Sequence, residues 1–435
     1  MKVYFETLGC PKNFYDTQTA AGILENSGHV ITDSPEEADA IVVNTCGFIN
    51  DAKKESIEAV FDMARYKENG VKLIVSGCLA KRYSEELFEE MPEVDAFIGV
   101  NDYDLLPSLL NSSERSVNVS ECSQTELPAM ERKIDGRITT ATIKIAEGCN
   151  NRCAYCIIPY IRGGYRSKRI ENVIAEAETL AQSGCRELIL IAQDTTYYGM
   201  DLYGKYMLPE LLRKLCRIDG IHWIRLMYCY EDRITDELIE TIREEDKICN
   251  YIDIPIQHAS DNVLRNMRRR STKKSIEKTL DKLRDRISDI HIRTTLITGF
   301  PGETEEDFDI LYDFVQEQRF ARLGVFPYSQ EEGTPAGEME NQVDEEIRAV
   351  RADDIMRMQL DISFENNRQK IGSVMEVIVD EIDEDGSFIG RTRYDAPEID
   401  NSVIFTSSRK LEPGDFVNVR ILDAFDYDLT GEEEI

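Results

Sequence analysis

The chain has 435 residues, and a hydrophobic content of 42% is ordinary for a globular protein that buries a large core. It contains no apolar run of about 18 residues, which excludes a transmembrane helix and with it a membrane partner. The start, MKVYFETLGC, lacks the pattern of a signal peptide, so we expect a cytoplasmic protein of about three domains.

The charge and the cysteine content narrow the range of possible functions further. The formal net charge is −32, from 51 basic and 83 acidic residues, and this argues against a protein that binds nucleic acid mainly through phosphates. The acidity serves either solubility or a basic partner, and composition does not decide between them. The eleven cysteines of a cytosolic chain are better explained as metal ligands or buried thiols than as a disulfide framework.

The first 110 residues alternate between apolar strand-like runs and amphipathic helical patterns, such as 51–67 and 84–91. This alternation predicts a doubly wound parallel α/β sheet. The expected strands are 2–8, 40–44, 72–76 and 96–100. The polar stretch 111–126 that follows is typical of a linker.

From residue 138 the alternation resumes with six β/α units, which predict a partial (β/α)6 barrel, since a full eight-unit barrel needs two more pairs. The expected strands are 140–147, 187–193, 223–228, 251–257, 292–299 and 323–329. Short expected strands at 374–382, 387–393, 401–407 and 416–424, with turns at 384–386 and 413–415, then predict a small all-β barrel. The domains are therefore expected at 1–125, 135–365 and 366–435.

Three closely spaced cysteines, Cys149, Cys153 and Cys156, follow the first barrel strand in the sequence EGCNNRCAYCIIP. Barrel enzymes build their chemistry from the loops at these strand ends, and a CxxxCxxC loop wraps one metal centre. Three thiolates leave one position of that centre open for a substrate or cofactor. Buried thiols or a zinc ligand set are the alternative interpretation.

A second set of cysteines has no short-range spacing. Cys10, Cys46 and Cys78 each follow a predicted strand of the N-terminal sheet, and each has a glycine beside it. If the sheet is parallel, all three lie at its carboxyl edge, where open α/β sheets bind ligands. A shared metal site is favoured, and three buried core thiols remain the alternative. The other five cysteines are interpreted as structural.

Further residues at barrel strand ends are candidates for contacting a cofactor. They are Gln193, Asp194 and Thr195 after the second strand, Gln257 after the fourth, and Gly299 after the fifth. His258 is equally well explained as a hydrogen-bonded loop histidine. The basic run at 264–274 is either a solvated helix end, with Ser271 capping the next helix, or a contact to RNA or to substrate carboxylates.

The segment CNNRCAYC, with Tyr155 before its third cysteine, resembles the signature of radical S-adenosylmethionine enzymes. The resemblance implies a 4Fe–4S cluster on these cysteines whose fourth iron is chelated by S-adenosylmethionine. Over essentially the whole chain, TLGCPKNFYD (7–16), NTCGFI (44–49), SGCLAKRY (76–83) and TGFPGETEEDF (298–308) resemble methylthiotransferases. That family carries a second 4Fe–4S cluster on three N-terminal cysteines and a C-terminal TRAM domain.

Within the family, CPKN (10–13), IAQDTTYYG (191–199), YSQEEGTPA (328–336) and GRTRYDAPEID (390–400) resemble the RimO type. The resemblance implies insertion of a methylthio group at the β-carbon of an aspartate in the twelfth small-subunit ribosomal protein, free or in the ribosome. A 5′-deoxyadenosyl radical would remove the hydrogen, and both clusters would carry the chemistry, with no separate catalytic side chain assigned. An electron donor such as flavodoxin or ferredoxin and a sulfur donor are implied as partners.

Two rival functions stay open. One is the same chemistry on a tRNA adenosine, and the other is a non-enzymatic iron–sulfur or zinc scaffold with a binding barrel. The charge favours a protein substrate, because residues 366–435 hold 7 basic and 17 acidic residues, a net of −10. Such a domain is repelled by RNA phosphates and attracted to a basic ribosomal protein, although plain solubility explains the same charge.

Overall fold

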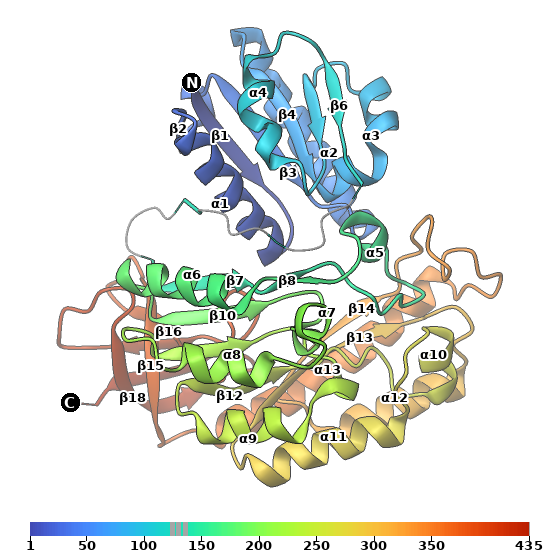
Figure 1. The fold of residues 1–435 in the computed structure, drawn as a ribbon. Helices are drawn as coiled ribbons and strands as arrows, with labels where there is room; N and C mark the ends of the chain where they lie inside the picture. The colour runs from blue at the N-terminus through green and yellow to red at the C-terminus, as the bar shows by residue number, and fades with distance from the viewer. Residues whose placement is uncertain (122–126, 128–131, 134–137, 435) are drawn as a thin grey trace. The chain divides into compact units, whose positions relative to one another are not determined.

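The computed structural model describes residues 1–121, 127, 132–133 and 138–434. The chain divides into two compact units, coloured along the sequence in Figure 1. The first unit consists of Met1–Gly136, Lys144–Asn172 and Ser329–Gly337. The second unit consists of Arg137–Ile143, Val173–Tyr328 and Glu338–Ile435. No helix in the described part of the chain is both long enough and apolar enough to cross a membrane.

The first unit is built on a six-stranded parallel sheet in the order β2-β1-β3-β4-β5-β6. Its strands are β1 (Lys2–Thr7), β2 (Val30–Ile31), β3 (Ala40–Thr45), β4 (Lys72–Gly77), β5 (Ala96–Ile98) and β6 (Ser116–Asn118). The four expected strands are all present, and the doubly wound parallel sheet is confirmed. The interpretation of 111–126 as a linker is wrong in part, because β6 lies inside it and pairs with β5. Residues 122–126 of that stretch, including Cys122, lie outside the described residues.

Helices cover both faces of this sheet (Figure 1). One face packs on α1 (Pro11–Asn26) and α4 (Leu106–Asn111), the other on α2 (Asn50–Ala64) and α3 (Cys78–Glu90). Side chains along a strand point alternately to opposite faces. Ala40 and Val42 of β3 therefore join the first core, whereas Ile41 and Val43 join the second. Burial on both faces explains why these strands are continuous apolar runs.

The second unit contains a six-stranded sheet in the order β14-β13-β12-β11-β10-β7. Its strands are β7 (Thr140–Lys144), β10 (Glu187–Ile191), β11 (Trp223–Leu226), β12 (Ile248–Asp253), β13 (His291–Thr298) and β14 (Arg322–Pro327). Helices fill the connections: α6 (Ile170–Gln182), α8 (Leu208–Leu215), α9 (Asp236–Glu244), α10 (Asp261–Asn266), α11 (Lys273–Arg286) and α12 (Glu305–Gln318). The first and last strands do not pair with each other, so the expected partial barrel is confirmed.

A helix, α13 (Glu345–Arg368), leads into a closed C-terminal barrel in the order β15-β16-β17-β19-β18. The strands are β15 (Val374–Ile382), β16 (Phe388–Thr392), β17 (Val403–Thr406), β18 (Phe416–Ala424) and β19 (Leu429–Glu433). Four of them match the expected segments. The fifth, β19, lies in the acidic end of the chain, whose sequence LTGEE is poor in strand-favouring residues. It forms because it pairs with β17 on one side and β18 on the other.

The C-terminal barrel is attached to the starts of the sheet strands by buried ion pairs. Glu187, the first residue of β10, accepts hydrogen bonds from Arg225 of β11 at 2.8 Å and from Arg391 of β16 at 2.9 Å. Burial raises the pKa of this carboxyl, but the two guanidinium groups outweigh burial and lower the pKa overall. Arg322, the first residue of β14, pairs in the same way with Asp395. Arg322 and Lys370 lower the pKa of Asp395 to about 2, against the opposing effect of burial.

Aromatic contacts extend the same junction. Trp223, at the start of β11, packs edge-on against Phe416 with ring centroids 4.8 Å apart. His291, at the start of β13, stacks on Tyr394 at 4.0 Å. Most of the segment GRTRYDAPEID therefore lies at this junction, where Arg391, Asp395 and other members are buried. Its structural task is to fix the C-terminal barrel to the sheet.

We expect Glu187→Gln to destabilise the second unit, because it removes the carboxylate that pairs with the buried Arg225 and leaves Arg391 with Asp380 alone. Breaking a buried charge pair from one side costs about 3–5 kcal/mol. The apparent melting temperature of the full chain measures the effect. The control is Glu237→Gln, which removes an exposed pair with Arg213; exposed pairs contribute about 0–1 kcal/mol. Equal melting temperatures for the two variants would contradict the assigned role of Glu187.

Candidate functional site

The three N-terminal cysteines lie together at the carboxyl edge of the first sheet. Cys10 follows β1 and caps the N-terminus of α1, Cys46 follows β3, and Cys78 follows β4 as the first residue of α3. Because β1, β3 and β4 are parallel neighbours, their ends meet at one edge. The expected gathering of the three strand ends is therefore present in the structure.

The thiols are close enough to influence one another. Burial raises the pKa of Cys78 to about 11, with Arg162 acting against it and Cys10 and Cys46 acting with it. Burial also raises the pKa of Cys46, and Cys10 adds to the effect. A buried thiol whose neighbours are thiols becomes a thiolate readily only when a positive centre binds it.

The glycines beside these cysteines bring the three loops into contact. A Cβ atom on Gly9 would lie 2.8 Å from Cβ of Cys46, and one on Gly47 would lie 2.9 Å from the carbonyl carbon of Cys78. Gly77 has φ +97°, and its Cβ would lie 2.4 Å from the carbonyl oxygen of Thr45. The glycines were expected to let the backbone approach a ligand. Their observed task is to let the cysteine-bearing loops approach one another.

The second triad lies in the first unit, on a loop that the expected strand 140–147 did not anticipate. β7 ends at Lys144, and a separate short strand, β8 (Ala146–Glu147), pairs antiparallel with β9 (Arg166–Ser167). Cys149, Cys153 and Cys156 lie between these two strands, ahead of the single-turn helix α5 (Ile158–Ile161). The CxxxCxxC segment is therefore the connection of a small hairpin.

Backbone hydrogen bonds hold this loop. The amide of Cys149 donates to the carbonyl of Gly163 at 3.1 Å, and the amide of Cys156 donates to the carbonyl of Cys153 at 3.1 Å. Ala154 accepts a hydrogen bond from Ala336, so the segment Ser329–Gly337 supports the loop. Burial raises the pKa of Cys156, and Cys153 and Cys149 act in the same direction. The three thiols of this loop are therefore close enough to influence the pKa of one another.

Each triad brings three cysteines to one loop or one sheet edge. Within the described part of the chain, no group of three or more His, Cys, Asp and Glu side chains is placed to hold a single metal ion. A single zinc ion requires its sulfur ligands to converge at about 2.3 Å. A four-iron cluster on either triad stays a prediction.

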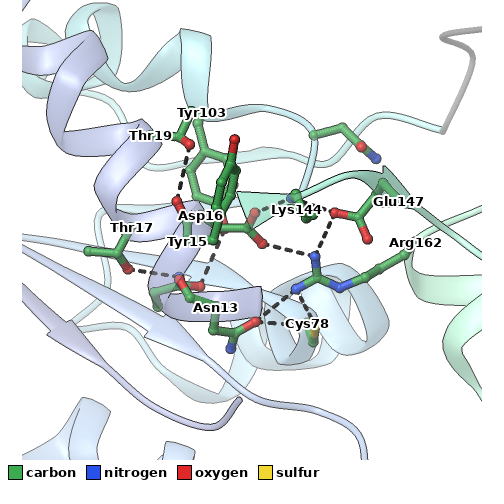
Figure 2. Close-up of polar contacts among 12 residues, drawn as sticks. Asn13, Tyr15, Asp16, Thr17, Thr19, Cys78, Tyr103, Lys144, Glu147 and Arg162 are labelled. Atoms are coloured by element: carbon green, nitrogen blue, oxygen red, sulfur yellow. Dashed lines mark hydrogen bonds and ion pairs between the residues drawn. The ribbon is translucent and has the colours of Figure 1, made fainter. Parts of the chain in front are cut away.

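A buried polar cluster, absent from the sequence-based candidates, connects the segment that bears the CxxxCxxC cysteines with α1 and Cys78 inside the first unit (Figure 2). Nη1 of Arg162 lies 2.9 Å from a carboxylate oxygen of Asp16 and 2.9 Å from one of Glu147. Lys144 pairs with both of these carboxylates. Asp16 belongs to the quoted segment TLGCPKNFYD, but nothing in its spacing indicates a partner 146 positions away.

The segment Ser329–Gly337 is anchored near the same edge. Glu331, 2% exposed, lies 2.8 Å from Nζ of Lys53 and 2.8 Å from Nη1 of Arg82. Arg82 also donates to the carbonyl of Gly47 at 3.0 Å. The motif YSQEEGTPA therefore connects the neighbourhood of Cys46 with the CxxxCxxC loop through Glu331 and Ala336.

The cofactor candidates of the second unit lie where the sequence placed them, at the carboxyl ends of β10, β12 and β13. The carboxylate of Asp194 pairs with Arg233 and caps the short helix Thr195–Tyr197. The hydroxyl of Thr195 donates to the carbonyl of Met227 at 2.5 Å. Both side chains thus have structural tasks. A cofactor contact from Gln193, Asp194 or Thr195 stays a prediction, as does one from Tyr155 in the first unit.

Gln257 and Gly299 adopt left-handed backbone conformations, at φ 71° and 69°. The backbone of Gln257 bonds to Thr295 and Ile297 of β13. Glu303 accepts a hydrogen bond from the amide of Gly299 at 2.8 Å. Their contact with a cofactor also stays a prediction.

His258 is fully buried, which fits the structural interpretation of this residue. Its Nδ1 accepts a hydrogen bond from the amide of Ser260 at 2.9 Å, and its Nε2 lies 3.4 Å from Glu303. With Nδ1 accepting, Nε2 carries the proton and faces the carboxylate. Thr304 caps α12.

The basic run at 264–274 is only partly exposed. Arg269 is buried and donates to Glu231 at 2.6 Å. Ser271 also bonds to Glu231, and the cap of α11 is Thr272. The expectation of Ser271 as the cap was wrong. Arg268 and Arg270 are exposed.

Three family models match the chain. They are the uncharacterized protein family UPF0004 over residues 2–99, the radical SAM superfamily over 143–315, and the TRAM domain over 371–433. The matches cover the first sheet, the CxxxCxxC loop with most of the second sheet, and the C-terminal barrel. They define a radical SAM protein, and this superfamily implies a 4Fe–4S cluster and S-adenosylmethionine.

Curated relatives are similar over the full length. The ribosomal protein uS12 methylthiotransferase RimO of Lachnoclostridium phytofermentans is 48% identical over 440 residues, covering 100% of both chains. The protein of the same name from Desulforamulus reducens is 50% identical, covering 98% of both, and that of Clostridioides difficile is 49% identical, covering 99% of this chain and 98% of its own. The chain belongs to the RimO family.

Solved structures share the fold at low identity. TsrM from Kitasatospora setae, a radical S-adenosylmethionine methyltransferase with tryptophan and a SAM analogue bound, gives a TM-score of 0.57 at 15% identity, covering 89% of this chain and 84% of that one. The cobalamin-dependent radical enzyme OxsB gives 0.53 at 14% identity, covering 82% and 56%. These likenesses concern the fold alone.

We expect Gly77→Ala to disturb the N-terminal triad, because a Cβ there would collide with the backbone of Thr45 in a conformation that only glycine adopts readily. The strain costs about 1–3 kcal/mol before the collision is counted. The matched control is Gly70→Ala in the same domain, at φ +80° with nothing within 4 Å of its Cβ, which costs about 1–2 kcal/mol. Thermal unfolding of the metal-free chain should show the larger loss for Gly77→Ala. The reverse order would mean that the loops do not need this close approach.

Proposed function

We propose that this chain is a radical SAM methylthiotransferase that modifies an aspartate of ribosomal protein uS12 at its β-carbon. Full-length similarity to relatives that carry this activity in their names is the observation that carries the proposal. The juxtaposition of two three-cysteine sets in one unit supports it. A non-enzymatic scaffold gives no reason for two incomplete ligand sets in one unit.

In this proposal Cys149, Cys153 and Cys156 hold the cluster that binds S-adenosylmethionine, and Cys10, Cys46 and Cys78 hold the auxiliary cluster. When bound, these groups would supply one-electron cleavage of S-adenosylmethionine and a site that carries the methylthio group, which side chains cannot supply. The chain itself would shield these groups from water and hold them in position. It buries four of the six cysteines: Cys46, Cys78, Cys149 and Cys153.

The C-terminal barrel is proposed as the surface that meets the substrate. Its carboxylates are largely exposed, among them Glu381, Asp383, Glu384 and Asp385 around the β15–β16 turn. Arg391 is buried at the junction with the sheet, so it does not offset this charge at the surface. Opposite charges steer association and suppress wrong partners, which favours a basic protein over a nucleic acid. An electron donor such as flavodoxin or ferredoxin, a sulfur donor and a cytoplasmic location complete the proposal.

The second candidate function is methylthiolation of a tRNA adenosine, which uses the same cofactors. The exposed acidic barrel disfavours it, because tRNA binding depends on phosphate contacts with basic side chains. Mass spectrometry of ribosomal proteins and of tRNA from a deletion strain distinguishes the two. We expect uS12 to lose the mass of one methylthio group and to regain it when the gene is restored. An unchanged uS12 together with a tRNA adenosine lacking the group would establish the rival function.

We expect the anaerobically reconstituted chain to hold about eight irons, two clusters of four. Replacing Cys10, Cys46 and Cys78 by alanine should leave about four, and replacing the other triad should also leave about four. The measurement is iron and acid-labile sulfide per chain. Cys229→Ala, which removes a buried thiol of the second unit, is the control and should leave the count unchanged. A parent chain with only four irons would remove the auxiliary cluster from the proposal.

A further inference from the structure

Arg162 reaches from the segment that bears the CxxxCxxC cysteines to the N-terminal triad. It follows α5 directly and is 1% exposed. Its Nη2 donates to Oδ1 of Asn13 at 2.8 Å and lies 3.4 Å from Sγ of Cys78 (Figure 2). The side chain of Arg162 therefore contacts a cysteine of one triad, while its backbone belongs to the segment that bears the other.

The ion pairs of Arg162 with Asp16 and Glu147 are made by its other terminal nitrogen, Nη1. Asp16 and Glu147 both bind Nη1 of Arg162, and Lys144 binds the same two carboxylates. The two cations, Arg162 and Lys144, therefore pair with the two carboxylates, Asp16 and Glu147. These four charges sum to zero before Cys78 is counted. Because the carboxylates hold Nη1, Nη2 is fixed toward Asn13 and Cys78. A planar guanidinium can serve both sides at once in this way, whereas an ammonium group cannot.

We propose that Arg162 is a positioning residue that donates an N–H···S hydrogen bond to the Cys78 ligand of the auxiliary cluster and raises the reduction potential of that cluster. The proposal rests on the auxiliary cluster of the proposed function. It also gives Arg162 a mechanical task, since the same side chain fixes the CxxxCxxC segment against the sheet edge that carries Cys78.

The direction of the effect follows from charge. Reduction adds one electron to a cluster held by three thiolates, so the reduced form is more negative than the oxidised form. A cation and an N–H donor beside a ligand sulfur stabilise the more negative form, and hydrogen bonds to the sulfurs are among the factors that set these potentials. Removing Arg162 should therefore lower the midpoint potential of the auxiliary cluster.

A purely structural ion pair makes a different prediction. If Arg162 only held Asp16 and Glu147, its loss would lower the stability of the chain and leave the potential of a fully assembled cluster unchanged. The midpoint potential of the auxiliary cluster therefore distinguishes a hydrogen-bond donor to Cys78 from a purely structural ion pair. A loss of stability alone does not change that potential.

The experiment uses the full chain with Cys149, Cys153 and Cys156 replaced by alanine, so that only the N-terminal triad can bind iron. In this parent, Arg162→Gln removes the charge and the N–H donors of the guanidinium, and Arg162→Lys keeps the charge without the planar fork. The matched control is Arg166→Gln, because Arg166 is also buried in the same unit and its side chain donates to Oδ1 of Asn101 and to the carbonyl of Arg162. Each protein is reconstituted with iron and sulfide, its iron is counted, and its midpoint potential is measured by redox titration of the visible and paramagnetic resonance signals.

We expect a lower midpoint potential for Arg162→Gln than for the parent, an intermediate value for Arg162→Lys, and the parent value for Arg166→Gln. An Arg162→Gln chain with about four irons and the parent potential would overturn the proposal. If Arg162→Gln does not fold, the lysine variant decides, and a parent potential there overturns it equally. If the parent itself binds no four-iron cluster, the auxiliary cluster is refuted along with this inference, and that failure is recognised because it occurs with Arg162 intact.

Discussion

Parallel strand pairing is the constraint from which the candidate site follows. In the first sheet it carries the ends of β1, β3 and β4 to one edge, and the three cysteines after those strands meet there although they are 36 and 32 positions apart. The glycines Gly9, Gly47 and Gly77 complete this arrangement, because they remove the side chains that would keep the three loops apart. The edge is thus formed by backbone geometry before any cofactor binds.

Buried charge is the second recurring feature. Arg162 with Asp16 and Glu147, Glu331 with Lys53 and Arg82, and Glu187 with Arg225 and Arg391 each join segments that are distant in sequence. A buried ion pair adds little net stability over an apolar contact, but one partner without the other is strongly unfavourable. Such clusters therefore select one arrangement of segments over others. In this chain they lie where loops or domains must be held in register.

Much of the architecture could be predicted from the sequence, and the failures have physical causes. The long apolar strands of both sheets and the strand-end cysteines were predicted because burial leaves a local pattern. β6 and β19 were missed because their short polar or acidic sequences gain strand structure only from neighbours. Arg162 was missed because a buried arginine has no local signature, and its partners lie 15 and 146 positions away. The role of the segment GRTRYDAPEID at a domain junction was likewise invisible, since its contacts are to the beginnings of distant strands.

If the acidic barrel is the substrate surface, as proposed, that junction sets a minimum size for the substrate. The C-terminal barrel contacts the beginnings of β10, β11, β13 and β14, whereas ligands of such sheets bind beyond the opposite, carboxyl ends. A strand of six residues is about 20 Å long. A substrate held by the barrel would therefore have to extend about that far to present an atom for reaction. A free amino acid or a short peptide would be too small to do both, so the distance itself would favour a large partner.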